Sequence, residues 1–254
     1  MLPNGDVLVA ESNAPAKAQA NKGIKTRVME LVMKVAGSGT VSPNRIVLLR
    51  DTNGDGVADF HSVMLDGLNS PFGMTLVGNE LYVANTDSVL RFPYSTRDTR
   101  IKVAGRKLLD LPAGQINYHW TKNIIANKDA SKVYVTVGSN SHIAESGMEA
   151  EIGRAAMWEI DINSGRHQIF ASGLRNPNGL VWELVTGALW TFVNERGELG
   201  SDLMPDYMTS ARKDDFYGWP YSYYGQIVDY RVQPQQPDMV ADDVGNVIWR
   251  VTAN

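Results

Sequence analysis

The sequence contains no cysteine, which excludes a disulfide, a thiolate zinc site, an iron–sulfur cluster and a cysteine nucleophile. It also lacks a basic excess: 24 lysines and arginines against 28 aspartates and glutamates give a net charge of −4, which argues against nucleic acid or an anionic membrane as partner. No apolar run approaches the roughly 18 residues of a spanning helix. The start, MLPNGDVLVAES, has neither the basic nor the apolar region of a secretion signal. We therefore expect no membrane span and no signal peptide in this chain.

Apolar residues are plentiful but occur in short runs. They make up 43% of the 254 residues, enough for a sizeable core in one domain. The runs are rich in β-branched and aromatic residues and are bounded by Gly, Asn, Asp and Pro, which predicts strands. Residues 25–36 differ, because their apolar residues recur at helical spacing, and we expect a helical insertion there. The expected strands are 6–11, 45–50, 80–85, 132–138, 188–194 and 246–251.

The apolar segments repeat along the chain. The period is about 50 residues once the helical insertion is set aside, which is close to the length of a four-stranded propeller blade. The prediction is therefore an all-β fold, a β-propeller. A β-sandwich is the second possibility. It would explain the spacing of the strands but not an internal sequence repeat of about 50 residues. The aligned copies are VLVAE, LYVAN, VYVTV, LWTFV and DMVAD, with Val9, Val83, Val135, Thr191 and Val240 in register.

A second internal match joins residues 58–74 to residues 164–180, about two blades further on. The match includes the turn glycines and prolines, which set the backbone path between strands. It also aligns His61 with His167, so both histidines are interpreted as structural. Positions that differ between the two copies are free to carry chemistry.

Three residues near these turns are candidates for chemistry. His119 lies in a turn before an expected strand, where it is either structural or a general base, since its pKa suits proton transfer near neutrality. Arg175 and Asn176 replace Asn69 and Ser70 of the matching copy, so the blade does not require them. A guanidinium and an amide at this turn either stabilise an oxyanion or form a polar contact between blades.

Several loops leave their roles open. Residues 51–59, DTNGDGVAD, are similar to the start of a calcium loop, but its twelfth position is Ser62, so a hairpin with Asx turns is favoured. Residues 194–202 form a second oxygen-rich segment. Six aromatic residues within 216–225 either wall a pocket or pack one blade on the next. His142 lies in a polar segment and is expected to be solvated.

Eight segments in a fixed order carry a family resemblance that covers most of residues 2–240: LPNGDVLVAES, NRIVLLRDTNGDGVADF, GLNSPFGM, HWTKNIIAN, YVTVGSNS, GLRNPNGL, NERGELGSD and FYGWPYSYYG. Together they resemble the glucose/sorbosone dehydrogenase family, and the nearest branch is the L-sorbosone dehydrogenase-like quinoproteins. The resemblance implies a six-bladed propeller that holds pyrroloquinoline quinone (PQQ) and calcium at its channel mouth. It also implies oxidation of an aldose or aldehyde sugar, and a periplasmic location.

Carried over residue by residue, the resemblance implies roles for single side chains. His119 matches the base that takes the proton from the sugar hydroxyl, and Arg175 matches an arginine near the quinone oxygen. The remaining implied contacts are Asn176, Asn178 (where relatives often carry glutamine) and Glu195 at the cofactor, and Arg196 and Gly197, whose backbone carbonyls would meet calcium.

The end of the chain departs from the family pattern. RVQPQQPDMV resembles the segment that leads into the late blades, ADDVGNVIWRVTAN resembles the last hairpin, and the two are joined at Val240–Ala241. About two blades are missing at this junction by the 50-residue period. We therefore expect residues 1–254 to form a single, incomplete propeller of about four blades plus a terminal hairpin. In the family the late blades bring the basic residues that hold the quinone carboxylates, whereas Arg231 and Arg250 are the only cations in 225–254.

Three functions follow from these observations. The first is a PQQ-dependent sugar dehydrogenase of the sorbosone or glucose type, with calcium and a small-molecule sugar as substrate. The second is a non-catalytic truncated propeller, a binding scaffold or relic without tight cofactor binding. A calcium-dependent propeller lactonase is the third, and it would need convergent carboxylates rather than a His/Arg pair. Open blade edges also predict association between copies of the chain.

Overall fold

The computed structural model describes residues 1–15, 32, 42–196, 204–223 and 226–241. Within these residues the chain forms strands in consecutive antiparallel sheets and one short 3₁₀ helix, η1 (Met148–Glu151). The expected helical insertion at 25–36 falls outside the described residues apart from Val32. The expected strand at 246–251 and the terminal hairpin also lie outside them.

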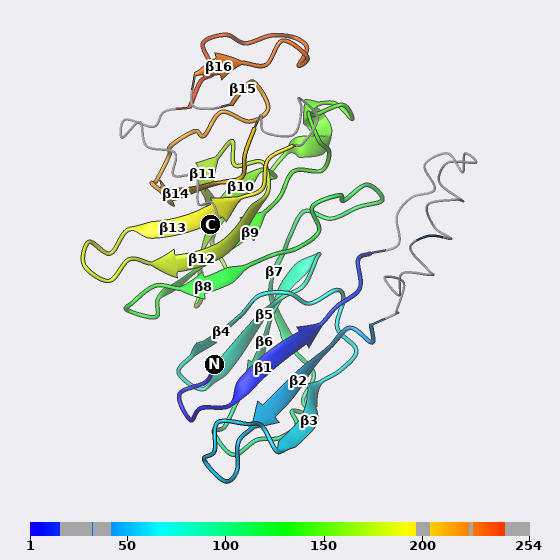
Figure 1. Ribbon diagram of the computed structural model, residues 1–254, viewed down its shortest axis with the longest axis vertical. Helices are drawn as coiled ribbons and strands as arrows, with labels where there is room; N and C mark the ends of the chain where they lie inside the picture. The colour runs from blue at the N-terminus through cyan, green and yellow to red at the C-terminus, as the bar shows by residue number, and fades with distance from the viewer. Residues whose placement is uncertain (16–31, 33–41, 197–203, 224–225, 242–254) are drawn as a thin grey trace.

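Four sheets follow one another along the chain, and each is a simple antiparallel meander (Figure 1). A two-stranded hairpin follows the fourth sheet. This succession of small meanders is the arrangement of propeller blades. Sheet by sheet, the strands are β1 (Val7–Glu11), β2 (Arg45–Arg50) and β3 (Phe60–Leu65); β4 (Met74–Val77), β5 (Glu80–Ala84), β6 (Ser88–Pro93) and β7 (Arg106–Asp110); β8 (Ile124–Ala126), β9 (Lys132–Val137), β10 (Ala156–Asp161) and β11 (His167–Ser172); β12 (Pro177–Trp182), β13 (Leu189–Val193) and β14 (Tyr207–Ala211); and the hairpin β15 (Ser222–Tyr223) with β16 (Ile227–Val228).

The sequence repeat has a direct structural meaning. Four of the aligned copies are the strands β1, β5, β9 and β13, of which the last three are the second strands of their sheets. The second match is also explained, because residues 58–74 and 164–180 each lead from the last strand of one sheet into the first strand of the next. The blade-like repeat is therefore confirmed over these residues.

The fifth aligned copy, DMVAD, is not a strand over its described residues, so this part of the prediction is wrong. Residues 238–241 lie in a turn and an irregular segment, and the backbone N–H of Met239 donates to the carbonyl of Gln236 at 3.0 Å. Pro234 and Pro237 just before it carry no backbone N–H, so they cannot contribute to a central ladder.

The core lies between the sheets rather than within any one of them. Strand β5 shows this most clearly, because its side chains alternate between two clusters. Leu81 and Val83 pack toward the first sheet, whereas Tyr82 and Ala84 pack toward the third. A third cluster joins the third sheet to the fourth. Strands buried on both faces read as continuous apolar runs, which is why the sequence marks them so well.

The first and fourth sheets each have one face without such a cluster among the described residues. Val7 and Val9 of β1 are exposed, whereas their alternating neighbours pack into the first cluster. Val181 of β12 and Phe192 of β13 are exposed in the same way on the fourth sheet. The described part of the molecule is therefore a stack with two partly apolar ends.

The acidic loop at residues 51–59 is a hairpin closed by its own side chains. The Asp51 carboxylate accepts hydrogen bonds from the backbone N–H groups of Gly54 (2.7 Å) and Gly56 (2.8 Å), and the Asp59 carboxylate accepts from the Thr52 hydroxyl at 2.6 Å. These bonds are the Asx turns that the sequence favours over a calcium loop.

Candidate functional site

The candidate side chains gather where the chain passes from one sheet to the next. The crossing between β7 and β8 carries His119, and the crossing between β11 and β12 carries Arg175 and Asn176. The connection from β9 to β10 begins between them, at Gly138. A Cβ atom on Gly138 would lie 2.5 Å from Cβ of His119 and 2.6 Å from Oδ1 of Asn176, so only glycine permits this approach. The two crossings therefore meet across the end of β9.

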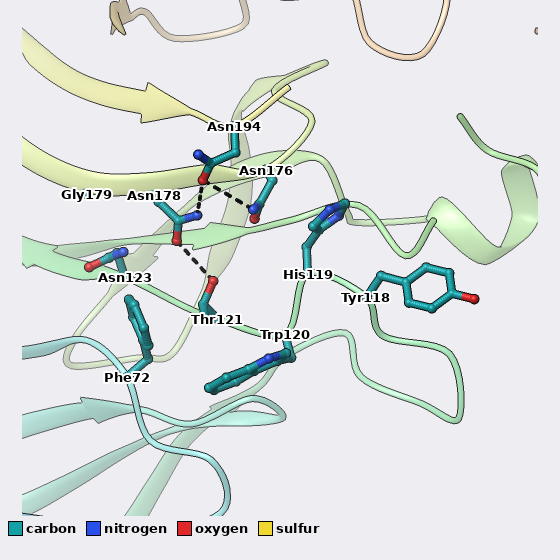
Figure 2. A pocket seen from close by; sticks show the side chains of 10 residues that line it. All are labelled: Phe72, Tyr118, His119, Trp120, Thr121, Asn123, Asn176, Asn178, Gly179 and Asn194. Carbon is teal, nitrogen blue, oxygen red and sulfur yellow. Dashed lines mark hydrogen bonds between the residues drawn. The ribbon is translucent and has the colours of Figure 1, made fainter. Parts of the chain in front are cut away.

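A cavity of about 530 Å³ opens beside this meeting point. Figure 2 shows Phe72 and Trp120 on one side of it and the amides of Asn178 and Asn194 on the other, with His119 near Trp120. The two aromatic rings pack edge to face, with centroids 6.1 Å apart. Aromatic surface opposed to amide groups suits a sugar ring or a flat heterocycle with polar edges.

Hydrogen bonding fixes the tautomer of His119. Its Nδ1 lies 3.0 Å from the carbonyl oxygen of Ser139 and 2.8 Å from the Ser139 hydroxyl. The carbonyl can only accept, and the hydroxyl donates its proton to the carbonyl of Ser141 at 2.7 Å. Nδ1 must therefore carry the proton. Nε2 has no hydrogen-bond partner among the described residues and keeps its lone pair.

The surroundings of His119 also keep this ring neutral. Burial lowers its pKa to about 4, and the positive charge of Arg175 acts in the same direction. The hydrogen bond to Ser139 opposes the shift without cancelling it. At neutral pH the imidazole is thus a base with a free nitrogen rather than a cation.

Arg175 is buried and holds the loop that follows Gly138. Its Nε donates to the His142 carbonyl at 3.2 Å, its Nη1 to the Asn194 carbonyl at 3.1 Å, and its Nη2 to the His142 Nδ1 at 3.0 Å. The ring of His142 stacks on Tyr118, with centroids 5.0 Å apart. His142 is exposed, as its polar segment predicts, and its ring is also held by an arginine and an aromatic face.

His142 brings the two expected active groups together. Its ring also meets His119 edge on, with centroids 6.0 Å apart, while its Nδ1 accepts from Arg175. His119 and Arg175 are therefore brought close together around His142.

A chain of amides forms the opposite wall of the cavity. The Asp206 carboxylate accepts from Nδ2 of Asn194 at 2.8 Å, so Oδ1 of Asn194 faces Nδ2 of Asn178 at 2.8 Å. Oδ1 of Asn178 in turn accepts from the Thr121 hydroxyl at 3.0 Å (Figure 2). A carboxylate cannot donate, so it sets the direction of every bond in the chain. Oδ1 of Asn176 is buried without a partner among the described residues.

Glu195 and Arg196 lie just beyond this wall. Burial raises the pKa of Glu195 to about 7, against the effect of Arg175 and Arg196. The Arg196 guanidinium is buried, forms an ion pair with Asp229 and directs its Nε to the sulfur of Met204 at 3.1 Å. Gly197, the second residue that the resemblance places at calcium, lies outside the described residues, as do residues 198–202 of the same loop.

The aromatic segment 216–225 packs against the sheets over its described part. Trp219 and Tyr221 are buried, and the Trp219 indole N–H donates to the carbonyl of His142 at 3.1 Å. None of the aromatic residues at 216–223 lines the cavity described above. The sequence left two roles for this segment, lining a pocket or packing one blade on the next. Its described residues pack between sheets and do not line this cavity.

Some residues of the site have no clear mark in the sequence. Ser139 acts through its backbone carbonyl, and His142 lies in a polar segment without periodicity. Lys122 is fully buried, and its Nζ lies 3.4 Å from the carbonyls of both His119 and Trp120. The sequence marks Lys122 only by its position, three residues after the candidate base in the segment HWTKN.

The comparisons with known proteins agree with this architecture. A sequence model described as TrAA12-like matches residues 42–221. The PQQ domain of pyranose dehydrogenase from Coprinopsis cinerea, in its holo form, gives a TM-score of 0.58 at 18% identity, over 74% of this chain and 52% of that chain. The calcium structure of a Trichoderma reesei enzyme of carbohydrate-active family AA12 gives a TM-score of 0.58 at 15% identity, over 82% of this chain and 60% of that chain.

The fold of this chain is also similar to that of a bacterial enzyme. The PQQ-bound aldose sugar dehydrogenase from Streptomyces coelicolor gives a TM-score of 0.54 at 15% identity, over 71% of this chain and 59% of that chain. A search of curated proteins finds no match. At these identities the solved structures establish the fold, that of β-propeller dehydrogenases, and the chain spans little more than half the length of the first two.

Proposed function

Because the chain belongs to the TrAA12-like family, we propose that it is a PQQ-dependent sugar dehydrogenase of the sorbosone or glucose type. Its substrate would be an aldose or aldehyde sugar. The observation that supports this most is the cavity beside His119, a neutral histidine whose Nδ1 is held by Ser139 and whose Nε2 is free to accept a proton.

The residues present fit one edge of PQQ. The cavity offers aromatic faces for a planar ring, and the buried, unpartnered Oδ1 of Asn176 lies beside it. Arg175 adds a buried positive charge nearby. When bound, PQQ supplies an acceptor for the hydride of the sugar carbon. We assign Asn176, Asn178 and Glu195 to its surroundings.

The protein groups have separable tasks in this reaction. Nε2 of His119 takes the proton of the sugar hydroxyl, which is possible at neutral pH because the pKa of this ring is lowered to about 4. The amide wall of Asn178 and Asn194 has fixed donor and acceptor directions, so it can orient sugar hydroxyls. Trp120 and Phe72 offer aromatic surface from the other side of the cavity, against which a sugar ring can stack.

Calcium would depend on backbone oxygens. The described residues contain no group of three or more His, Asp or Glu side chains placed to hold a metal ion. By the family resemblance we assign calcium to the backbone carbonyls of Arg196 and Gly197, which follow Glu195 in the sequence.

One observation favours a second candidate, a non-catalytic binding module. No lysine or arginine is among the described residues that line the cavity, although the quinone carries carboxylates. Arg231, one of the two late cations, pairs with Asp229 at 3.0 Å. Weak cofactor binding would make the chain a scaffold for sugars or flat ligands.

Binding and turnover separate the two candidates. The purified chain is titrated with PQQ in the presence of calcium, and dye reduction is then followed with a series of aldoses. Saturable one-to-one binding with aldose-dependent dye reduction supports the dehydrogenase. His119→Ala is expected to lower kcat about 100-fold or more. Absence of saturable binding would support the scaffold.

The pH profile and a matched control complete this test. Because the pKa of His119 is about 4, the loss of kcat/KM that is due to its protonation should appear only near pH 4 and should be absent from His119→Ala. His61→Ala is the control, because His61 is exposed on β3 and away from the cavity. Unchanged turnover in His119→Ala would remove His119 from the mechanism.

The location and assembly are further proposals. The family resemblance supports a periplasmic location, which fractionation of the native host tests. No helix among the described residues is long and apolar enough to cross a membrane. Association between copies through the exposed faces of the first and fourth sheets is tested by sedimentation over a range of protein concentrations.

A further inference from the structure

A buried carboxylate behind the cavity has no part in the proposed reaction so far. Glu151 ends the 3₁₀ helix η1 and is almost fully buried. Its Oε2 accepts from the backbone N–H of Asn140 at 2.6 Å, and its Oε1 accepts from the Ser141 hydroxyl at 2.5 Å. Burying a carboxylate is costly, so a group like this is retained where its hydrogen bonds hold something in place.

The two bonds of Glu151 lead directly to the candidate base. The Ser141 carbonyl accepts from the Ser139 hydroxyl at 2.7 Å, and Ser139 in turn accepts from Nδ1 of His119 through both of its oxygens. Ser139 and Ser141 are fully buried. The path from carboxylate to imidazole is therefore continuous and contains no exposed side chain before His119.

The same loop fixes Arg175. The backbone N–H of Ser139 donates to the carbonyl of Arg175 at 2.7 Å, and the carbonyl of His142 accepts from Nε of Arg175 at 3.2 Å. Residues 139–142, which we name the relay loop, thus contact both expected active groups. A shift of this loop would move both groups at once.

A second set of hydrogen bonds connects the turn at Glu151 to the segment that precedes His119. The backbone N–H of Arg154 donates to the carbonyl of Glu151 at 2.9 Å. The Arg154 guanidinium then donates to Oδ1 of Asn117 and to the carbonyl of Ala113, both at 2.8 Å. The turn at 151–154 therefore holds the relay loop and the segment that leads into His119.

We propose that Glu151 is a positioning residue for this site: through Ser141 and Ser139 it holds the relay loop so that His119 keeps its proton on Nδ1 and presents Nε2 to the cavity. The proposal rests on the proposed function for its effect on turnover. Its structural content, the tautomer and orientation of His119, holds with or without cofactor.

The test measures the tautomer directly. In the ¹⁵N-labelled full-length chain, the two-bond correlations of each histidine ring report which nitrogen carries the proton, and a His119→Gln variant assigns the His119 signals. We expect Nδ1–H for His119 in the unchanged protein. In Glu151→Gln one acceptor oxygen becomes a donor, so we expect a mixture of tautomers. We also expect a His119 pKa that is lowered further, because the hydrogen bond to Ser139 that raises it is weakened.

Kinetics give the second readout. Glu151→Gln should lower kcat about tenfold or more with a smaller change in KM, because the base is misaligned while the amide wall is intact. Glu149→Gln on the same helix is the matched control, since Glu149 is exposed, and it should behave like the unchanged chain. Glu151→Asp should recover part of the loss.

The outcomes separate this proposal from the proposed function. An unchanged His119 tautomer and pKa in Glu151→Gln would overturn the positioning role, whatever the turnover. A changed tautomer in a chain that oxidises no sugar would support the positioning role and count against the dehydrogenase. Should Glu151→Gln fail to fold, Ser141→Ala removes one bond of the path and keeps Glu151 bonded to Asn140, with the same expected shift in tautomer.

Discussion

At the scale of single residues, the site combines groups that the sequence marks with groups that it does not. His119 and Arg175 could be predicted, because an internal repeat showed that the blade does not require Arg175 and because a family resemblance covered both. Ser139 and Glu151 could not be predicted, since they act through a backbone carbonyl and through bonds that bridge ten residues or more. The contact of His142 with Arg175 could not be predicted for a related reason, because the two residues lie 33 positions apart.

Lys122 offers a test of the electrostatics at this scale. Burial lowers its pKa from 10.5 to about 7, and Arg154 adds to the shift. The unfolded chain therefore binds more protons between about pH 7 and pH 10.5, so this lysine makes the free energy of unfolding rise with pH over that window. Lys122→Met should remove this rise and raise the free energy of unfolding at pH 6 by about 1–3 kcal/mol, the cost of a poorly paired buried polar group.

Urea denaturation of Lys122→Met and of the unchanged chain at pH 6, 8 and 10 checks this expectation. Lys128→Met is the matched control, because Lys128 is an exposed lysine on the turn before β9. A pH dependence that survives in Lys122→Met would show that another group causes it.

At the scale of elements, the inner strands β5 and β9 were the easiest to predict, because they are buried on both faces. Strand β9 alternates between two clusters, with Val133 and Val135 on one side and Tyr134 on the other, so these three consecutive positions are all apolar. The pattern failed at DMVAD, where apolar residues follow two prolines and form no ladder. Short apolar runs indicate a strand only where backbone N–H groups are available to pair.

Gly138, which directly follows β9, carries a prediction at this scale. Its φ is not in the left-handed region, so an alanine would be tolerated by the backbone, but its Cβ would contact His119 and Asn176. We expect Gly138→Ala to lower the free energy of unfolding by about 1–3 kcal/mol, as overpacking does, and to lower kcat by far more than the stability loss explains.

Gly105→Ala is the control for that experiment. Its Cβ would lie 2.5 Å from the ring of Phe92, so it should cost similar stability at a place remote from the cavity. Chemical denaturation gives the stability and dye reduction gives kcat. Equal losses of kcat in both variants would mean that Gly138 has no special relation to the site.

At the scale of the whole molecule, stability is a sum of interfaces between neighbouring sheets. The second and third sheets each have a core cluster on both faces, whereas the described residues show a cluster on only one face of the first and fourth. The sequence predicted this succession through its period of about 50 residues.

Hydrogen exchange measured by mass spectrometry tests this order. Amides of β5 and β9 should exchange most slowly, and those of β1 and β14 markedly faster, because opening an end sheet breaks one interface and opening an inner sheet breaks two. Protection spread evenly over all four sheets would contradict the nearest-neighbour description.

The placement of the site across a seam has its own consequence. His119 enters the third sheet and Arg175 enters the fourth, so their meeting depends on the junction between those two sheets. Separating the fourth sheet from the third would dismantle the chemistry while leaving most strands paired. Loss of ligand binding on heating should therefore precede the loss of the far-ultraviolet circular dichroism signal, and additives that clamp this junction should delay it.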